Sequence, residues 1–247
     1  MLSKGEKLNQ RREFLAKPEL TPPVTVRLKF RKTGNLQYIS HLDLQRTFNR
    51  VLVRSCIPVW YTKGFNPHIK LVFSTPLSVG TQSVCEYLDI RVDREISCEE
   101  IMERLNRELT EELCITEAYI PKSDFSEIAY ASYEYEIFTS GATAELAKSI
   151  EAVLTTSPLN MVKRTKAGDK EIDIIPLIKS VKAWYDENAG SIKLQGVFSA
   201  TSTEFLNPEM IITALKQKGM ILLGSLAEEH YSITRNRVMK EDMSEFR

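Results

Sequence analysis

Residues 24–58 read VTVRLKFRKTGNLQYISHLDLQRTFNRVLVRSCIP, where an apolar period of two gives way to a period near four. Over 24–30 apolar residues alternate with polar ones, which is the pattern of a strand that buries one face. The polar face carries Arg27 and Lys29 and is therefore cationic. We expect a half-buried strand here, followed by a turn at Gly34-Asn35.

A helix is predicted over 41–55. Ser40, followed three residues later by Asp43, resembles a capping box, and Pro58 stops the helix. One side of this helix is mostly apolar, and arginines recur every four residues on nearly the opposite side. The apolar side carries Leu44, Phe48, Val51, Leu52 and Ser55, and the arginines are Arg46, Arg50 and Arg54.

Similar patterns predict the helices and strands of the rest of the chain. Ser97 with Glu100 predicts a second helix start, and Asn207 with Pro208 predicts a later one. Alternating segments predict strands at 59–63, 68–74, 84–92, 115–120, 132–138, 159–165, 171–185, 191–199 and 230–238, with a further helix at 142–154.

The predicted fold class is α+β, with two ferredoxin-like-type β-α-β-β-α-β halves that have antiparallel sheets. The two halves show no repeat at the level of residues. The expected divisions are a flexible lead-in at 1–23, a basic half at 24–120, a linker at 121–131, a second half at 132–240 and a tail at 241–247.

Charge is unevenly distributed along the 247 residues, although 33 Lys and Arg balance 33 Asp and Glu. Residues 24–80 carry nine basic residues and one acidic residue, whereas 81–160 carry six basic and 17 acidic residues. A folded chain can place one basic face beside acidic ones. The segment 24–80 is therefore where we expect an anionic partner to bind.

The cysteines indicate neither a metal site nor a disulfide framework. Cys56, Cys85, Cys98 and Cys114 lack the close pairing that holds zinc or an iron–sulfur cluster, so we expect no cofactor and no metal. Residues 1–23 lack the apolar core of a leader, and no apolar run approaches the roughly 20 residues of a membrane span. We expect a cytoplasmic protein that does not bind membranes.

The arginine stripe of the first predicted helix suits a phosphate backbone. Three guanidinium groups spaced by four residues offer bidentate donors along about 12 Å of helix. A solvated helix face is the alternative, since charge runs often only make a surface soluble. Additional unpaired cations and interleaved aromatic residues in the same segment, which include Tyr38, Trp60 and Tyr61, favour RNA.

A second candidate is the loop Lys63-Gly64-Phe65-Asn66-Pro67-His68-Ile69-Lys70. Glycine and Asn-Pro favour a turn, and an apolar ring at a loop tip is either buried or used. The two interpretations are a ligand-contact loop and a structural hairpin with Phe65 in the core.

Glu86 is expected on the apolar face of its strand, where a carboxylate needs a partner. A structural ion pair is one interpretation and a catalytic role is the other. His41, His68 and Glu86 are the candidates for general acid–base chemistry, but no spacing brings them together, and we assign no catalytic residue.

A dense set of motifs runs through residues 32–87. It comprises Lys32-x-Gly34, Tyr38-Ile39-Ser40-His41-Leu42-Asp43-Leu44-x-Arg46-x-Phe48-x-Arg50, Gly64-Phe65-Asn66-Pro67-His68-x-Lys70, Pro76-Leu77-x-x-Gly80, Ser83 and Glu86-Tyr87. Together these motifs resemble the radical SAM-linked protein family, a bacterial domain of unknown function also called DUF2344. The resemblance implies association with a radical SAM protein that has a cobalamin-binding-like domain. Because the cluster-binding cysteines are absent from this sequence, it resembles the stand-alone accessory partner.

The leading hypothesis is a non-catalytic module that binds a structured RNA, tRNA or rRNA, and presents it to a radical SAM protein encoded nearby. DNA is not an expected partner. One alternative is a metal-independent ribonuclease or RNA-modifying subunit that uses His41 or His68, and another is a pure protein–protein adaptor. The candidate RNA- or ligand-binding residues are Lys32, Ser40, His41, Asp43, Arg46, Arg50, Arg54, Lys63, Gly64, Phe65, Asn66, His68, Lys70 and Glu86.

Overall fold

The computed structural model describes residues 3–156, 158–165, 168–225 and 228–247. It divides into two compact units, unit 1 (Met1–Asp124 with Arg247) and unit 2 (Phe125–Phe246). The division after Asp124 falls inside the segment 121–131 that is expected to be a linker. Both units combine helices with antiparallel strands, so the α+β class is confirmed.

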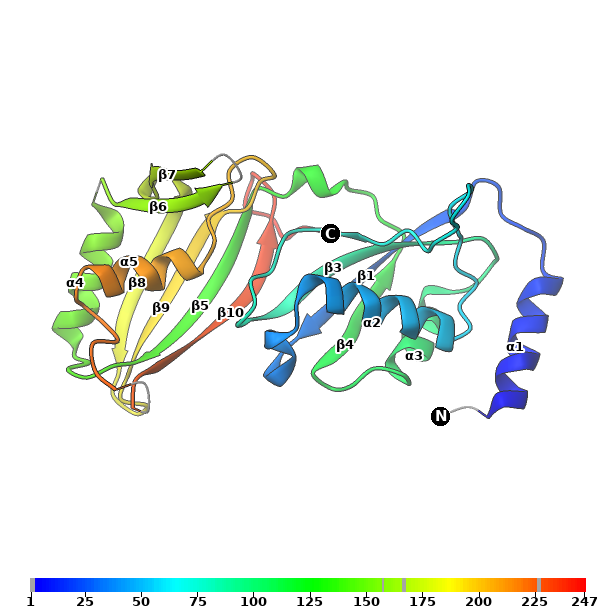
Figure 1. The fold of residues 1–247 in the computed structure, drawn as a ribbon, viewed down its shortest axis with the longest axis horizontal. Coiled ribbons are helices and arrows are strands. Elements are labelled where there is room, and N and C mark those ends of the chain that lie inside the picture. The colour runs from blue at the N-terminus through cyan, green and yellow to red at the C-terminus, as the bar shows by residue number, and fades with distance from the viewer. Residues whose placement is uncertain (1–2, 157, 166–167, 226–227) are drawn as a thin grey trace. The chain divides into compact units, whose positions relative to one another are not determined.

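Unit 1 has an antiparallel sheet with the strand order β4-β1-β3 (Figure 1). The short strand β2 pairs with β3. Strand β1 is central because its alternating apolar residues pair on both edges, with Val26 opposite Ile90 of β3 and Leu28 opposite Ala118 of β4. The strands are β1 (Val24–Lys32), β2 (Val72–Phe73), β3 (Thr81–Val92) and β4 (Leu113–Tyr119).

Helices α2 (His41–Arg54) and α3 (Cys98–Asn106) pack on this sheet. The start of α2 is the predicted one, since the Ser40 hydroxyl accepts a hydrogen bond from the Asp43 N–H at 3.2 Å. The predicted apolar side of α2 is buried, and the Phe48 ring meets Phe30 of β1 edge to face at 5.0 Å. A short 3-10 helix, η1 (Gly34–Tyr38), joins β1 to α2.

The lead-in that is expected to be flexible contains a helix, α1 (Lys4–Ala16). It begins with a capping box in which the Glu6 N–H donates to the Ser3 hydroxyl and the Ser3 N–H donates to the Glu6 carboxylate. Residues 59–63 do not form the predicted strand. They form only isolated β-bridges, Val59 with Val92 and Tyr61 with Ile69.

Unit 2 has the antiparallel strand order β10-β5-β9-β8, and β6 pairs with β7 in a separate hairpin. The predicted strand over 171–185 is wrong in one respect, because it is interrupted at Pro176 by the 3-10 helix η3 (Ile175–Leu177). The elements are η2 (Phe125–Glu127), β5 (Tyr130–Phe138), α4 (Ala144–Thr155), β6 (Asn160–Thr165), β7 (Gly168–Asp173), β8 (Ile178–Asp186), β9 (Ser191–Ser199), α5 (Glu209–Gln217) and β10 (His230–Met239).

Phe246, in the segment expected to be a tail, is buried, and its ring packs against Phe125 at 5.9 Å. Within the described ranges, no helix combines the length and the apolar character that crossing a membrane requires.

Candidate functional site

The arginine stripe of α2 is divided between two environments. Arg46 is 68% exposed and donates to the Asp43 carboxylate at 3.1 Å, and Arg50 is exposed and forms no ion pair among the described residues. Arg54 instead contacts the buried Glu108 at 2.6 Å. Two of the three predicted phosphate contacts, Arg46 and Arg50, therefore remain open to a ligand.

Asp43 organises the start of α2. Its carboxylate accepts hydrogen bonds from the Ser40 hydroxyl at 2.7 Å and from Arg46, and both lower the pKa of Asp43. Asp43 therefore stays ionised and holds Arg46 at the first turn. Ser40 and Asp43 have this structural role and need no ligand to explain them.

The cationic face that the sequence predicts for β1 is largely neutralised inside unit 1. The Arg27 side chain is 2% exposed and lies against the Asp89 carboxylate at 2.7 Å. Lys29 pairs with Glu117 of β4 at 3.0 Å. These strand cations therefore contribute little to binding an external polyanion.

Lys32 and Glu86 are both inside the unit. Lys32 is 2% exposed, and its Nζ donates to the carbonyls of Gln37 and Ile39, both at 3.3 Å. These carbonyls precede α2, so Lys32 positions the start of that helix. Glu86 is 5% exposed and lies opposite Phe30 in the β1–β3 pairing, so RNA cannot reach it at the surface.

The segment 61–69 forms a narrow hairpin. The Thr62 N–H donates to the His68 carbonyl at 2.9 Å, and the His68 N–H donates to the Thr62 hydroxyl at 3.1 Å. The Nδ1 atom of His68 also lies 3.1 Å from the Asn66 carbonyl, and Gly64 has φ +145°, which favours glycine. Local polar contacts therefore hold this loop in shape.

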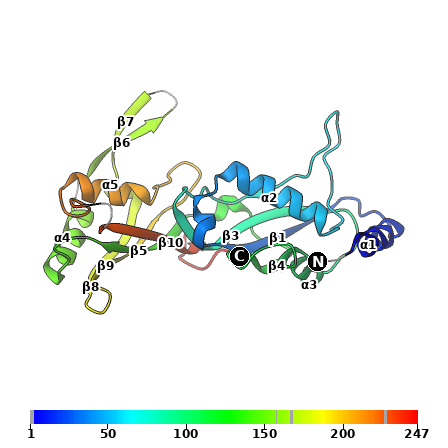
Figure 2. The same ribbon diagram turned by 60° about the horizontal axis from the view of Figure 1, so that its bottom comes forward.

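Phe65 at the tip of this hairpin is fully exposed, at 111% of its reference surface. The interpretation that places it in the core is therefore wrong. Lys63 near the tip and Lys70, which follows the Tyr61–Ile69 bridge at the base of the hairpin, are exposed, and neither side chain forms a hydrogen bond or ion pair within the described part of the chain. The loop, drawn in cyan in Figure 2, stands out from the rest of unit 1.

Other aromatic residues of the segment have mixed roles. Tyr38 is 64% exposed and Tyr61 is 45% exposed. Trp60 is half-buried, with the Arg91 guanidinium 5.5 Å from the centre of its ring. Phe65 and Tyr38 are therefore the rings most accessible to a base.

The candidate acid–base residues do not form a constellation. The ring of His41 is exposed and packs on Phe73 at 4.9 Å, whereas His68 is held by its own loop. In the described ranges no hydrogen bond or ring contact joins His41 to His68.

A groove that the sequence does not predict lies between α1 and the end of α2, with a volume of about 520 Å³. Its α1 wall includes Leu8, Arg11 and Leu15, which recur at three- and four-residue spacing. That spacing and the Ser3–Glu6 capping box are the two sequence features from which the helix that forms this wall could be predicted.

The fold and the surface define an α+β protein whose first unit carries an aromatic-tipped cationic loop. The family described as "Uncharacterized protein conserved in bacteria (DUF2344)" matches residues 25–208, and the chain belongs to this family. No curated protein matches the chain.

Distantly similar solved structures include two that align with most of this chain. The first is a chain of the "Crystal Structure of a Cbf5-Nop10-Gar1 Complex", with 10% identity and a TM-score of 0.46 over 88% of this chain and 50% of that one. The present chain therefore spans half the length of that relative. The second is "an Unknown Protein from Galdieria sulphuraria", with 9% identity and a TM-score of 0.25 over 86% of this chain and 98% of that one. Likenesses this distant do not bear on function.

Proposed function

We propose that the chain is a non-catalytic cytoplasmic module that binds a structured RNA, tRNA or rRNA, and presents it to a radical SAM enzyme. The observation that supports the proposal is the fully exposed Phe65 at the tip of a hydrogen-bonded loop that carries the exposed, unpaired Lys63 and is followed by the exposed, unpaired Lys70. The radical SAM partner is an expectation from the family motifs.

An unpaired base suits this loop better than a duplex. A ring at a loop tip can stack on a base that is splayed out of an RNA loop or bulge, and adjacent cations can contact the flanking phosphates. The deep, narrow major groove of a regular RNA helix is inaccessible to side chains, and its paired bases are not free to stack on a protein ring. Arg46 and Arg50 on α2 supply further phosphate contacts, because both are exposed.

The experiment is retention of total cellular RNA by the purified protein at low and moderate salt, followed by sequencing of the retained RNA. One enriched class names the substrate, and its affinity is then measured over a range of salt concentrations. Replacing both Arg46→Gln and Arg50→Gln removes two phosphate contacts. The slope of log K against log salt should then fall by about 1.4 to 1.8.

The matched control is the pair Lys216→Gln and Lys218→Gln, which removes two exposed cations at the end of α5 in unit 2. This pair should leave the salt slope unchanged. No retained RNA at either salt, or an unchanged slope in the arginine double variant, would overturn the proposal.

A further inference from the structure

The groove of unit 1 has two walls that each expose aliphatic side chains. On the α1 wall, Leu8 is 51% exposed and Leu15 is 65% exposed. On the opposite wall, Val53 near the end of α2 is 55% exposed. The chain after α2 continues this wall through Ile57 and Val59, which are buried at its base. The groove therefore has a buried apolar base, and the aliphatic side chains on both of its walls are exposed to solvent.

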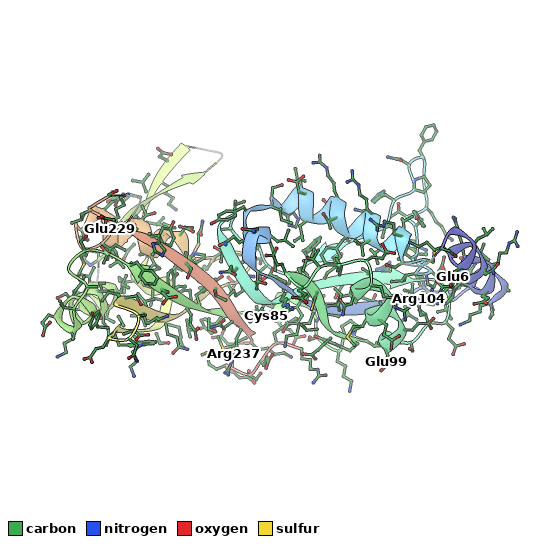
Figure 3. All side chains as sticks on the ribbon, turned by 90° about the horizontal axis from the view of Figure 1, so that it is seen from below. Glu6, Cys85, Glu99, Arg104, Glu229 and Arg237 are labelled. Carbon is green, nitrogen blue, oxygen red and sulfur yellow. The ribbon has the colours of Figure 1, made fainter. Side chains whose placement is uncertain are left out.

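Polar contacts hold α1 in place, so the groove is formed without an occupant. Lys7 of α1 donates to Glu108 at 2.8 Å, and its carbonyl lies 3.6 Å from Cys56 Sγ. Arg104 of α3 lies beside α1 (Figure 3) and donates to Gln10 at 3.3 Å. A preformed groove lowers the conformational cost of binding.

The rim of the groove has a surplus of positive charge. Lys7 and Arg54 share the single carboxylate of Glu108, and Arg11 forms no ion pair among the described residues. Arg94 is compensated by Asp93 at 3.4 Å, and both of these line the groove. An occupant that places carboxylates over Arg11 and Arg54 therefore matches the groove in charge.

We infer that this groove binds an amphipathic helix of a partner protein, with apolar residues at i, i+3 or i+4, and i+7 and with acidic residues beside them. Helix-in-groove recognition uses this spacing of apolar anchors. The walls are aliphatic at Leu8, Leu15 and Val53, which suits Leu or Ile side chains of a helix better than flat bases.

RNA is the less suitable occupant. Tyr61 is the one aromatic residue exposed among the described lining residues. The other ring, Phe14, is buried, with the cationic groups of Lys17 and Arg104 at 5.0 and 4.8 Å from its centre. A nucleic acid in this groove would lack the stacked rings that single strands use. The inference does not rest on the proposed RNA binding.

The test is a selection from a displayed library of randomised helical peptides of about 15 residues, carried out against the full chain. Parallel selections use the variant Leu15→Asp and the control Leu223→Asp, which changes a leucine of unit 2 with 67% exposure. Wild-type protein and the control should enrich acidic peptides with the stated apolar spacing. The Leu15→Asp variant should not enrich them.

The affinities of protein variants for one selected peptide then show where on the protein the peptide binds. Leu15→Asp and Val53→Asp should each weaken binding about tenfold or more. Leu42→Asp should not, because Leu42 is a 60% exposed residue of α2 that lies outside the groove lining. Arg11→Glu should weaken the acidic peptide and make its binding less sensitive to salt.

Two outcomes would overturn the inference. One is that no acidic amphipathic peptide is enriched relative to Leu15→Asp. The other is that selected peptides bind Leu15→Asp and Val53→Asp as tightly as wild type. The RNA proposal fails separately, through the Arg46 and Arg50 variant. A loss of RNA binding in Leu15→Asp without peptide enrichment would make the groove an RNA site.

Discussion

Arg27 of β1 lies directly opposite Asp89 of β3 and donates two hydrogen bonds to its carboxylate, from Nε at 2.7 Å and from Nη2 at 2.8 Å. The arrangement is bidentate, and Arg27 also donates to the Ser123 hydroxyl at 3.1 Å. It joins the basic segment 24–80 to the acidic segment 81–160 inside one unit. Part of the charge asymmetry of the sequence is therefore neutralised by ion pairs within the fold.

Replacing Asp89→Ala should lower the free energy of unfolding by about 3 to 5 kcal/mol, because it leaves the Arg27 guanidinium buried without its carboxylate. Denaturant unfolding followed by circular dichroism measures the loss. Glu103→Ala is the control, since it removes an exposed ion pair with Arg107 and should cost less than about 1 kcal/mol. If both variants lose equally little free energy of unfolding, the Arg27–Asp89 ion pair does not have the stabilising role assigned to it.

Elements with a clear period could be predicted from the sequence, and long-range ion pairs could not. The strand expected over 24–30 is β1 (Val24–Lys32), and the helix expected over 41–55 is α2 (His41–Arg54). The partners of Arg27 and Lys29, however, lie 62 and 88 residues away along the chain. A count of local charge cannot detect such partners, so the open cationic surface is smaller than the sequence indicates.

The sequence does not predict helix α1, because most of its residues are polar and Gly5 interrupts its first turn. Its stability comes from tertiary contacts such as the Lys7–Glu108 pair, which local propensity does not reveal. The sequence also does not predict that the Phe65 ring is exposed. The same Gly and Asn-Pro turn signals are compatible with a buried ring and with an exposed one.

Replacing Phe65→Ala should weaken RNA binding by about 5- to 150-fold, because one stacked base contributes about 1 to 3 kcal/mol. Thermal stability should be unchanged, since the ring is fully exposed. Fluorescence anisotropy with the enriched RNA measures the affinity. Phe65→Trp keeps a stacking surface and should preserve binding, and equal binding by Phe65→Ala would remove the loop from the proposed interface.

Glu229 should make unit 2 sensitive to acid. Hydrogen bonds from the N–H groups of Ser140 and Gly224, and from the Thr139 hydroxyl, lower the pKa of Glu229 from 4.5 to about 2. Because the folded pKa is depressed, the stabilisation is present above pH 4.5 and is lost as the pH falls from there towards 2.

The replacement Glu229→Gln should therefore lower the melting temperature at pH 7 and reduce the loss of stability between pH 5 and pH 2. Thermal unfolding across this range compares it with Glu228→Gln, which changes the neighbouring exposed carboxylate. If both variants keep the wild-type pH dependence, the acid sensitivity has another source.

Glu108 should control the attachment of α1. Burial raises the pKa of Glu108, but Lys7 and Arg54 outweigh it and hold this pKa below its ordinary value. Replacing Glu108→Gln leaves both cations without their shared carboxylate, so α1 should detach more often. Tryptic cleavage after Arg11 and Arg12 should become faster, and Glu111→Gln, an exposed neighbour, should cleave at the wild-type rate.

The central position of β1 has a consequence for synthesis of the chain. The strand emerges from the ribosome before its two neighbours, β3 and β4, which end only at Val92 and Tyr119. Pairing between segments so distant in sequence is slow, and synthesis proceeds at only about 5 to 20 residues per second. The nascent chain therefore exposes the apolar face of Val26, Leu28 and Phe30 for several seconds, and this is the stage at which a chaperone has most to shield.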